Sequence, residues 1–408
     1  MRSLTLIYGL STAQEHGAIC LLQGAVILLA DGSQEMLSLS AIAVVVLIAR
    51  LAGQPSGGRI ADAWPHRRAL MFAAVAGMCA AVLLASGLLV GSVAALAGLA
   101  AVTFRAGFQD PIRLSAIAVV CRSDSITAHT VVQTARIIAI MASLVVGGVV
   151  ADVIWGGGAP LAAGWPAVVA LALLAIGEWL AARRLSDHQP SAPVERIMAR
   201  YHIWKSPGFA PTAVMLSLYW GANQALVVCF PDRLQDIQPD AGASEVLGIH
   251  AIALLGTISG LTIARKRPSL VSRLSRPAVV TFACLAILPW AESWLMIVPL
   301  VLLYGAAGGC LIVAGNIAIQ RSAPAGGSGA AFAAFLTAQS SVMLAALATC
   351  AIAGSMGSEG TEVLLWLSLI AAMTTTILAI AAVSPSTKDN PCTSAHFTGS
   401  TSPSSQER

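Results

Sequence analysis

Charged residues are scarce in this chain of 408 residues: Lys, Arg, Asp and Glu make up 10% of it, whereas about 25% is usual in soluble domains. Hydrophobic residues make up 57%. A soluble fold of this length cannot bury so much apolar surface, whereas a lipid bilayer accommodates it. The net charge of +4 is small, and no basic patch is interleaved with aromatic residues, which argues against nucleic acid as a partner.

Motifs of metal sites and enzymes are also missing. The eight cysteines stand singly and none has C-x-x-C spacing, so free buried thiols are expected rather than a zinc site or a redox pair. No D-D-x-x-D, G-x-S-x-G, H-E-x-x-H or Walker A sequence occurs. We therefore expect no metal, no cofactor and no enzymatic activity. The first apolar stretch, from about 4 to 30, is too long for a signal peptide and long enough to cross a bilayer.

One segment of ten residues occurs twice, about half a chain apart. Residues 53–62 read G-Q-P-S-G-G-R-I-A-D and residues 256–265 read G-T-I-S-G-L-T-I-A-R. Both copies share a G-x-x-S-G-x-x-I-A frame, end an apolar run and lead into a basic loop. Two homologous membrane halves with the same small-residue helix end are typical of secondary transporters.

Apolar runs predict an all-α integral membrane protein with twelve transmembrane helices in two pseudo-symmetric halves of six. The runs lie near 4–30, 37–54, 69–90, 92–120, 126–151, 160–182, 207–230, 245–264, 277–292, 294–320, 327–354 and 361–383. The predicted division is an N-terminal half at 1–182, a cytoplasmic linker at 183–206, a C-terminal half at 207–383 and a tail at 384–408. The tail is rich in Ser, Thr and Pro and is expected to be disordered.

Positive charge is distributed unevenly between the loops. With both termini in the cytoplasm, 20 of the 23 Lys and Arg residues fall on the cytoplasmic side. Arg233 falls outside, and Arg105 and Arg136 lie within crossings. This bias satisfies the positive-inside rule and predicts a multi-pass protein of the bacterial inner membrane with both termini cytoplasmic.

The loop after the second predicted crossing contains Gly58, Asp62, Arg67 and Arg68. Their order resembles the signature loop of the major facilitator superfamily, roughly G-x-x-x-D-R-x-G-R-R, with Ala63 in place of the first arginine. Glycine lets two helices approach closely, and the acid can cap a neighbouring helix or pair with a cation. The resemblance spans nearly the whole chain and implies the fold of that superfamily, with these four residues as a gate motif. A solvated turn acid is the alternative for Asp62.

A second resemblance concerns residues 108–152. Gln133-Thr134-Ala135-Arg136 and the following S-L-V-V-G-G at 143–148 are similar to the branch of macrolide-efflux proteins and enterobactin-type siderophore exporters. Leu144 stands where that branch has a proline. The resemblance implies proton-driven export.

Ionisable residues inside the crossings are the candidates for coupling, because each costs about 2.5–3.5 kcal/mol at mid-bilayer unless it has a partner or a function. Glu15 and Arg105 lie at matched, central depths of the first and fourth crossings. We therefore predict that they pair, with Glu15 as the proton-coupling acid, or else form a static ion pair. His16 is either a proton relay or simply hydrogen-bonded. Asp110 and Arg113 are expected to form a local salt bridge.

Further polar side chains are candidates for substrate binding. Gln23 shares a helix face with His16. Arg136 is the candidate anion-binding residue or, alternatively, bonds a structural partner such as a backbone carbonyl. In the seventh crossing, aromatic rings stand beside amides, a combination that suits an amphipathic organic substrate or, alternatively, interhelical packing. These residues are Tyr219, Trp220, Asn223 and Gln224, with His250, Asn316 and Gln339 as weaker candidates.

The function that these observations favour is secondary active transport. The expected activity is proton-coupled export of a small organic molecule, siderophore-like or drug-like, by alternating access. Import of a small nutrient or metabolite by the same fold is the alternative. The expected partners are the small-molecule substrate, protons and the lipid bilayer, and the protein is expected to act as a monomer.

Overall fold

The computed structural model describes residues 1–29, 39–120, 125–186, 203–206, 208–237, 243–267, 269, 274–324 and 327–355. Within these ranges the chain is helical and contains no β-strand. The predicted twelfth crossing (361–383), the tail (384–408) and most of the predicted linker lie outside the described residues.

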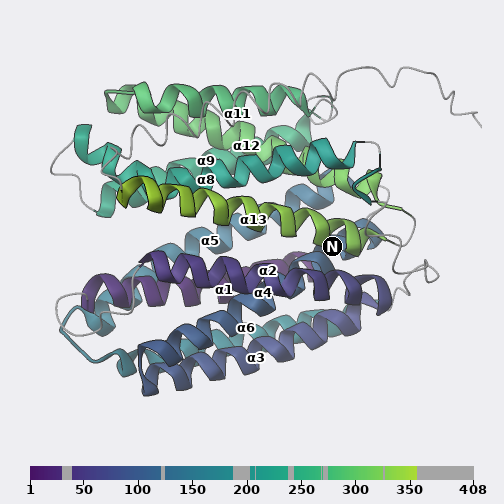
Figure 1. Ribbon diagram of the computed structural model, residues 1–408. Helices are drawn as coiled ribbons and strands as arrows, with labels where there is room; N and C mark the ends of the chain where they lie inside the picture. Colours follow the sequence, from purple (N-terminus) through teal and green to yellow (C-terminus); the bar gives the residue numbers. More distant parts are fainter. Residues whose placement is uncertain are drawn as a thin grey trace, which may run out of the picture.

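The first half is a bundle of long helices joined by short connections. Its elements are α1 (Arg2–Leu29), α2 (Leu39–Ala63), α3 (His66–Val90), α4 (Ser92–Val120), α5 (Ser125–Trp155), the 3₁₀ helix η1 (Leu161–Gly164) and α6 (Trp165–Arg183). The second half contains α8 (Phe209–Ile237), α9 (Ala243–Lys266), α11 (Ser275–Ile287), the 3₁₀ helix η2 (Leu288–Trp290), α12 (Trp294–Ser322) and α13 (Ser328–Ser355). Figure 1 shows the two groups one above the other, with α13 along the boundary between them.

Apolar composition and turn residues explain where these helices run and stop. Within the described part of the chain, α3, α4, α5, α6 with η1, α12 and α13 are each long and apolar enough to cross a membrane. Gly91 alone separates α3 from α4 and has a φ of 144°, a region that side chains exclude. The predicted break between Trp290 and Trp294 is present, because α11 passes into η2 and α12 starts afresh at Trp294.

The second helix is longer than the sequence indicated. The apolar run ended at 54, but α2 continues through Pro55 to Ala63. The connection to α3 is therefore very short, and His66, Arg67 and Arg68 form the first turn of α3. Proline removes one backbone donor but does not end a helix that is held by its neighbours. As a result, the predicted gate motif lies on helix ends rather than in a loop.

The repeated segment has the same packing role in both halves. A Cβ atom at Gly53 or Gly57 would collide with the backbone of α4. In the second copy, a Cβ atom at Gly256 or Gly260 would collide with the backbone of α12. The glycines thus allow α2 to lie directly against α4 and α9 against α12, which is the close approach that small residues permit in membranes. The sequence repeat therefore corresponds to a structural repeat.

The two halves meet through α2 and α4 against α13, and through α5 against α9 and α12. Several polar contacts between them lie at the end of the bundle that carries the start of α13 and the end of α12. Ser115 Oγ is 2.7 Å from Ser328 Oγ, and His129 Nε2 is 3.1 Å from Gln320 Oε1. An apolar cluster also joins the halves, with Ile137 of α5 packed against α9 and α12. These polar contacts join the halves at the end predicted to face the cytoplasm, and Gln54 Nε2 donates to Ser340 Oγ at 2.8 Å nearer the middle of α2 and α13.

Candidate functional site

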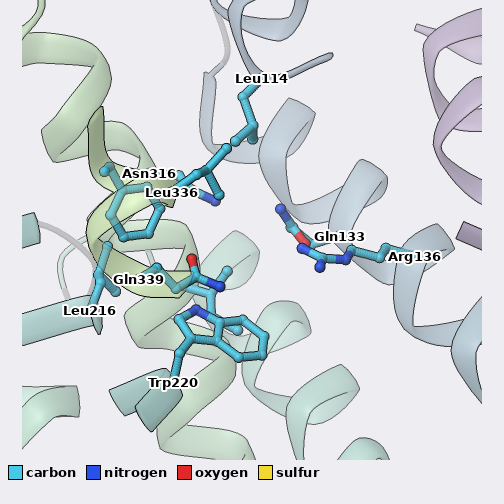
Figure 2. Close-up of a pocket in the computed structure, with 10 residues that line it drawn as sticks. Leu114, Gln133, Arg136, Leu216, Trp220, Asn316, Leu336 and Gln339 are labelled. Carbon is cyan, nitrogen blue, oxygen red and sulfur yellow. The ribbon is translucent and has the colours of Figure 1, made fainter. Parts of the chain in front are cut away.

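A cavity lies between the halves, deeper than these contacts. Side chains from α4, α5, α8, α12 and α13 surround about 310 Å³ of empty space, which includes the opening to solvent. Its lining consists of Leu114, Gln133, Arg136, Leu216, Trp220, Ile312, Asn316, Phe335, Leu336 and Gln339. Figure 2 shows Gln133 and Arg136 on one wall, with Trp220, Asn316 and Gln339 across from them. The cavity combines one cation, an indole, three amides and an apolar surface.

Arg136 is the charged group of this cavity. Its guanidinium carbon lies 5.9 Å from the centre of the Trp220 ring, at the outer range of a cation–π contact. Within the described part of the chain, no carboxylate lies within ion-pair distance of Arg136. Arg136 and Trp220, both predicted as substrate-binding residues, therefore come together from different halves.

A chain of alternating charges runs beside the cavity, from α1 through α2 to α4. Glu15 Oε1 lies 3.2 Å from Arg50 Nη1. Arg50 also donates to Asp110, which in turn accepts from Arg113. The guanidinium of Arg113 stacks over the Tyr8 ring at 4.5 Å. Glu15, Asp110 and Arg113 are buried, with at most 6% of each side chain exposed.

The predicted pairing of Glu15 with Arg105 is wrong. Arg105 instead pairs with Glu178 of α6, and it donates to Ser11 Oγ (2.9 Å) and to the carbonyl of Ala73 (3.1 Å). Matched depth does not decide which helix a side chain faces, and Glu15 lies against α2, where its partner is Arg50. Arg50 had been counted with the cytoplasmic cations, although it lies well inside α2.

Glu178 is held by two donors one helical turn apart. Arg105 donates to Oε2 and Gln109 donates to Oε1, while Ser11 Oγ donates to Gln109 Oε1 at 2.6 Å. Glu178 is fully buried and Arg105 has 2% of its side chain exposed. This second network joins α1, α4 and α6 within the first half. Arg105 and Gln109 thus act together on one carboxylate, which their spacing of four residues made geometrically possible.

The remaining predicted residues of α1 lie away from the cavity lining. His16 Nδ1 is 3.1 Å from the carbonyl oxygen of Thr12, within the same helix. Gln23 is half-buried on α1 and is not among the residues that line the cavity. The structure therefore does not bring His16 or Gln23 together with Arg136.

Of the four predicted residues on α8, only Trp220 lines the cavity. Tyr219 is buried behind it, with ring centres 5.4 Å from Trp220 and 5.8 Å from Tyr304 of α12. Tyr304 Oη donates to Asn223 Oδ1 at 3.2 Å, and Gln224 is half-buried. Tyr219 and Asn223 therefore take part in packing between α8 and α12, which was the alternative interpretation.

The far wall of the cavity was only partly foreseen. Asn316 and Gln339, considered weak candidates in the sequence, line it directly. Gln133 was noted for its place in a motif, and the spacing of three residues from Arg136 puts the two on one helix face. The signal that would have selected Asn316 and Gln339 is their position as amides inside apolar runs.

The gate motif joins the two halves at the predicted cytoplasmic end. The backbone N–H groups of Gly329 and Ala330, in the first turn of α13, donate to Asp62 Oδ1 and Oδ2, each at 2.8 Å. Gly58 lies against Ala333 and Gly329, where a Cβ atom would collide. Asp62 lies beyond the apolar part of α2, and burial raises the pKa of its carboxyl to about 6, while the two backbone donors act in the opposite direction.

The other two members of the motif lie on α3. Arg68 is exposed and Arg67 is half-buried. Next to them, His66 Nε2 is 3.1 Å from Ser115 Oγ, which in turn contacts Ser328 of α13. The motif and its surroundings therefore connect α2, α3, α4 and α13 at one end of the bundle.

Comparisons with known proteins agree with this architecture. The family profile described as Major Facilitator Superfamily matches residues 21–347. No curated protein matches the sequence. Among solved structures, the fold is similar to the human organic anion transporter MFSD10 (TETRAN), with a TM-score of 0.74 at 11% identity, covering 92% of this chain and 99% of that one.

Two bacterial structures are similar to the same extent. A bacterial homologue of the iron transporter ferroportin, in an outward-facing state, has a TM-score of 0.73 at 15% identity, covering 94% of this chain and 99% of that one. The fucose:proton symporter FucP of E. coli has a TM-score of 0.70 at 11% identity, covering 93% of this chain and 97% of that one. At such low identities these similarities concern the fold alone.

Proposed function

This chain belongs to the major facilitator superfamily, and we propose that it couples the movement of protons to the export of a small organic molecule. The superfamily consists of multi-pass membrane transporters, so the chain is a transporter rather than an enzyme. The similar structures carry different substrates, and the substrate therefore has to be inferred from the cavity itself. That cavity between the halves, with Arg136 and Trp220 on facing walls, is the observation that carries the proposal.

Glu15 is the proposed proton acceptor. Its Oε1 atom is buried and accepts no hydrogen bond from the described residues, and its contact with Arg50 is ionic, at 3.2 Å. By contrast, Asp110 and Glu178 each accept hydrogen bonds from an arginine. A buried carboxylate with few donors loses less on protonation than one that is fully bonded, which favours Glu15 over the other two.

Alternating access follows from the contacts between the halves. With both termini in the cytoplasm, the end that carries Asp62 and the start of α13 is the cytoplasmic one. Release of Asp62 from the start of α13 would free the two halves to rock about the cavity. Gly58, Asp62, Arg67 and Arg68 are accordingly proposed as the gate. The protein is proposed to act as a monomer, because the cavity lies within a single chain.

Export is proposed from the resemblance of residues 133–148 to the macrolide-efflux and siderophore-exporting branch. Proton-coupled uptake is the second candidate, and one observation favours it. Glu15 belongs to the charge network of the same half as Arg136, so protonation of Glu15 would remove a negative charge and strengthen the binding of a negatively charged substrate. Two ligands that favour each other's binding are expected to move together rather than in exchange.

Mass spectrometry of cells and medium tests the proposed function. Parent and deletion strains are compared with iron plentiful and scarce, and the deletion is complemented with the wild-type gene or with Glu15→Gln. A compound that accumulates in deletion cells and is missing from their medium supports export, and an iron-binding compound seen only under iron scarcity identifies a siderophore. A compound left unconsumed in the deletion medium means uptake. Transport by Glu15→Gln that still followed the proton gradient would contradict the role of Glu15.

A further inference from the structure

The charges of the first half do not balance, and the imbalance is located at the cavity. Four arginines of this half lie away from the ends of its helices: Arg50, Arg105, Arg113 and Arg136. Arg50 and Arg113 are matched by Glu15 and Asp110, and Arg105 is matched by Glu178. Among the described residues no acid pairs with Arg136, whose guanidinium lies near the Trp220 ring. An unpaired guanidinium inside a membrane protein is costly and is expected to have a functional partner.

We propose that this partner is the substrate, and that the substrate is a small organic monoanion with an apolar, preferably aromatic, body. The proposal rests on the proposed transport function and specifies what the cavity binds. Its carboxylate, or an equivalent planar anionic group, is held by Arg136. Its body lies between Trp220 and the apolar wall.

The geometry of Arg136 suits an anion. At 5.9 Å from the Trp220 ring centre, the guanidinium leaves its N–H edges free, and such an edge binds a carboxylate through two parallel hydrogen bonds. The residue is half-buried, so it is partly shielded from water yet open to the cavity. Gln133, one turn earlier on α5, adds an amide donor on the same wall (Figure 2).

The rest of the lining restricts the body of the ligand. Leu114, Leu216, Ile312, Phe335 and Leu336 make this surface apolar, while the amides of Asn316 and Gln339 can bind one or two polar substituents. Together with the indole of Trp220, this wall suits an apolar ligand body, as is usual in small-molecule sites.

The lining of the cavity also indicates which ligands it binds poorly. None of the ten lining residues is acidic, so an ammonium group has no carboxylate to meet. A zwitterion such as an amino acid would therefore bury an uncompensated positive charge. A second carboxylate would have to lie against the apolar wall, because Arg136 supplies a single cation. Selection for a monoanion over zwitterions and dianions follows from both features.

Equilibrium binding to the purified full chain in nanodiscs tests this inference without any gradient. Isothermal titration calorimetry with benzoate and phenylacetate is compared with benzamide, phenylalanine and phthalate. We expect the two monoanions to bind and the neutral, zwitterionic and dianionic probes to bind at least about tenfold more weakly. The same titration in nanodiscs of uncharged and of anionic lipid separates a free acid from a lipid headgroup, since a lipid ligand would compete with benzoate only in the anionic discs.

The variants isolate Arg136 from a general effect of losing an arginine. Arg136→Gln is expected to lower benzoate affinity by about tenfold to a hundredfold, the effect of removing a charge-assisted pair of hydrogen bonds. Arg136→Lys keeps the positive charge but loses the paired N–H donors of the guanidinium, so it should retain part of the affinity for benzoate. The control is Arg183→Gln, because Arg183 lies over Trp179 at 4.7 Å on an exposed part of α6. This control should bind benzoate like the wild type.

The outcomes separate the anion site from the transport function. Equal benzoate binding by Arg136→Gln and wild type, or tighter binding of benzamide or phenylalanine than of benzoate, would overturn the inference. So would a failure of both monoanions to bind at millimolar concentration. Should Arg136→Gln not fold, as judged by size-exclusion chromatography, the same comparisons apply to Arg136→Lys. Export or uptake of a neutral compound would support the transport function whatever the fate of the anion site. Anion binding by a protein that transports nothing would refute the transport function but not the anion site.

Discussion

Removing the carboxylate of Asp62 should release the contact that joins the halves at the predicted cytoplasmic end. Asp62 accepts one hydrogen bond on each oxygen, at 2.8 Å, from the N–H groups of Gly329 and Ala330. Asp62→Ala leaves both donors of the α13 terminus without this partner. Loss of a helix cap typically costs about 0.5–2 kcal/mol, and hydrogen bonds to a charged group about 1.5–3 kcal/mol. A loss of about 2 kcal/mol corresponds to roughly a 30-fold shift toward the open cytoplasmic end.

Distances between spin labels measure this shift directly. Labels on cysteines introduced at Arg59 of α2 and Arg321 of α12, both exposed, report the separation of the halves in a background without native cysteines. Asp62→Ala should move the distance distribution toward longer values. Asp152→Ala removes an exposed acid of α5 and is the control, which should leave the distribution unchanged. The reasoning would be refuted by an Asp62→Ala distribution identical to that of the wild type.

The pH dependence of the same distances gives an independent check. Burial raises the pKa of Asp62 to about 6 from its ordinary value of 3.8, so the joined state binds a proton more tightly than the released state. Protonation therefore favours the joined state. This stabilisation is complete below about pH 3.8 and is lost as the pH rises through 6. Asp62→Asn keeps one oxygen acceptor and no charge, so its distances should not respond to pH in this range.

Three further predictions concern other parts of the chain. Glu178→Ala leaves Arg105 buried without its acid and should lower stability by about 3–5 kcal/mol, seen as a shorter half-life on heating in detergent. Replacing both residues by methionine should restore much of the lost stability. Equal half-lives of the single and double variants would contradict this. Glu15→Gln mimics the protonated acid. In calorimetry it should bind benzoate about fivefold more tightly than the wild type at neutral pH, and the affinity should no longer depend on pH. A pH profile like that of the wild type would reject Glu15 as the coupled group. Gly260→Ala forces α9 away from α12 and should lower thermal stability by about 1–3 kcal/mol, whereas Gly148→Ala, which meets no atom within 4 Å, should not.

The helical class and the approximate helix positions were readable from the sequence. Apolar runs gave the approximate extent of the described helices because each must supply about 20 apolar residues to span the bilayer. The gate loop and the repeat were also visible, since a glycine that permits close approach is required at a fixed place on a helix. The boundary at Pro55 was wrong because tertiary contacts keep α2 helical past a residue that usually marks an end.

Partners across helices were not readable in the same way. Glu15 and Arg105 lie at similar depths, yet Glu15 pairs with Arg50 and Arg105 with Glu178. Depth follows from residue number, because each residue adds 1.5 Å along the axis. The direction in which a side chain points, and the helix that it meets there, depend on how the bundle is packed.

The sequence by itself indicated the membrane class, the two-fold repeat, the motif that contains Asp62 and four residues that line the cavity, Arg136, Trp220, Asn316 and Gln339. Each of these depends on composition or on spacing along one helix. The tertiary structure decided which acid belongs to which arginine, and it alone showed that Arg136 has no acid among the described residues. It also moved Tyr219 from the cavity to the packing behind it. A cavity between two halves is formed by residues far apart in the chain, and their juxtaposition is a property of the fold rather than of any segment.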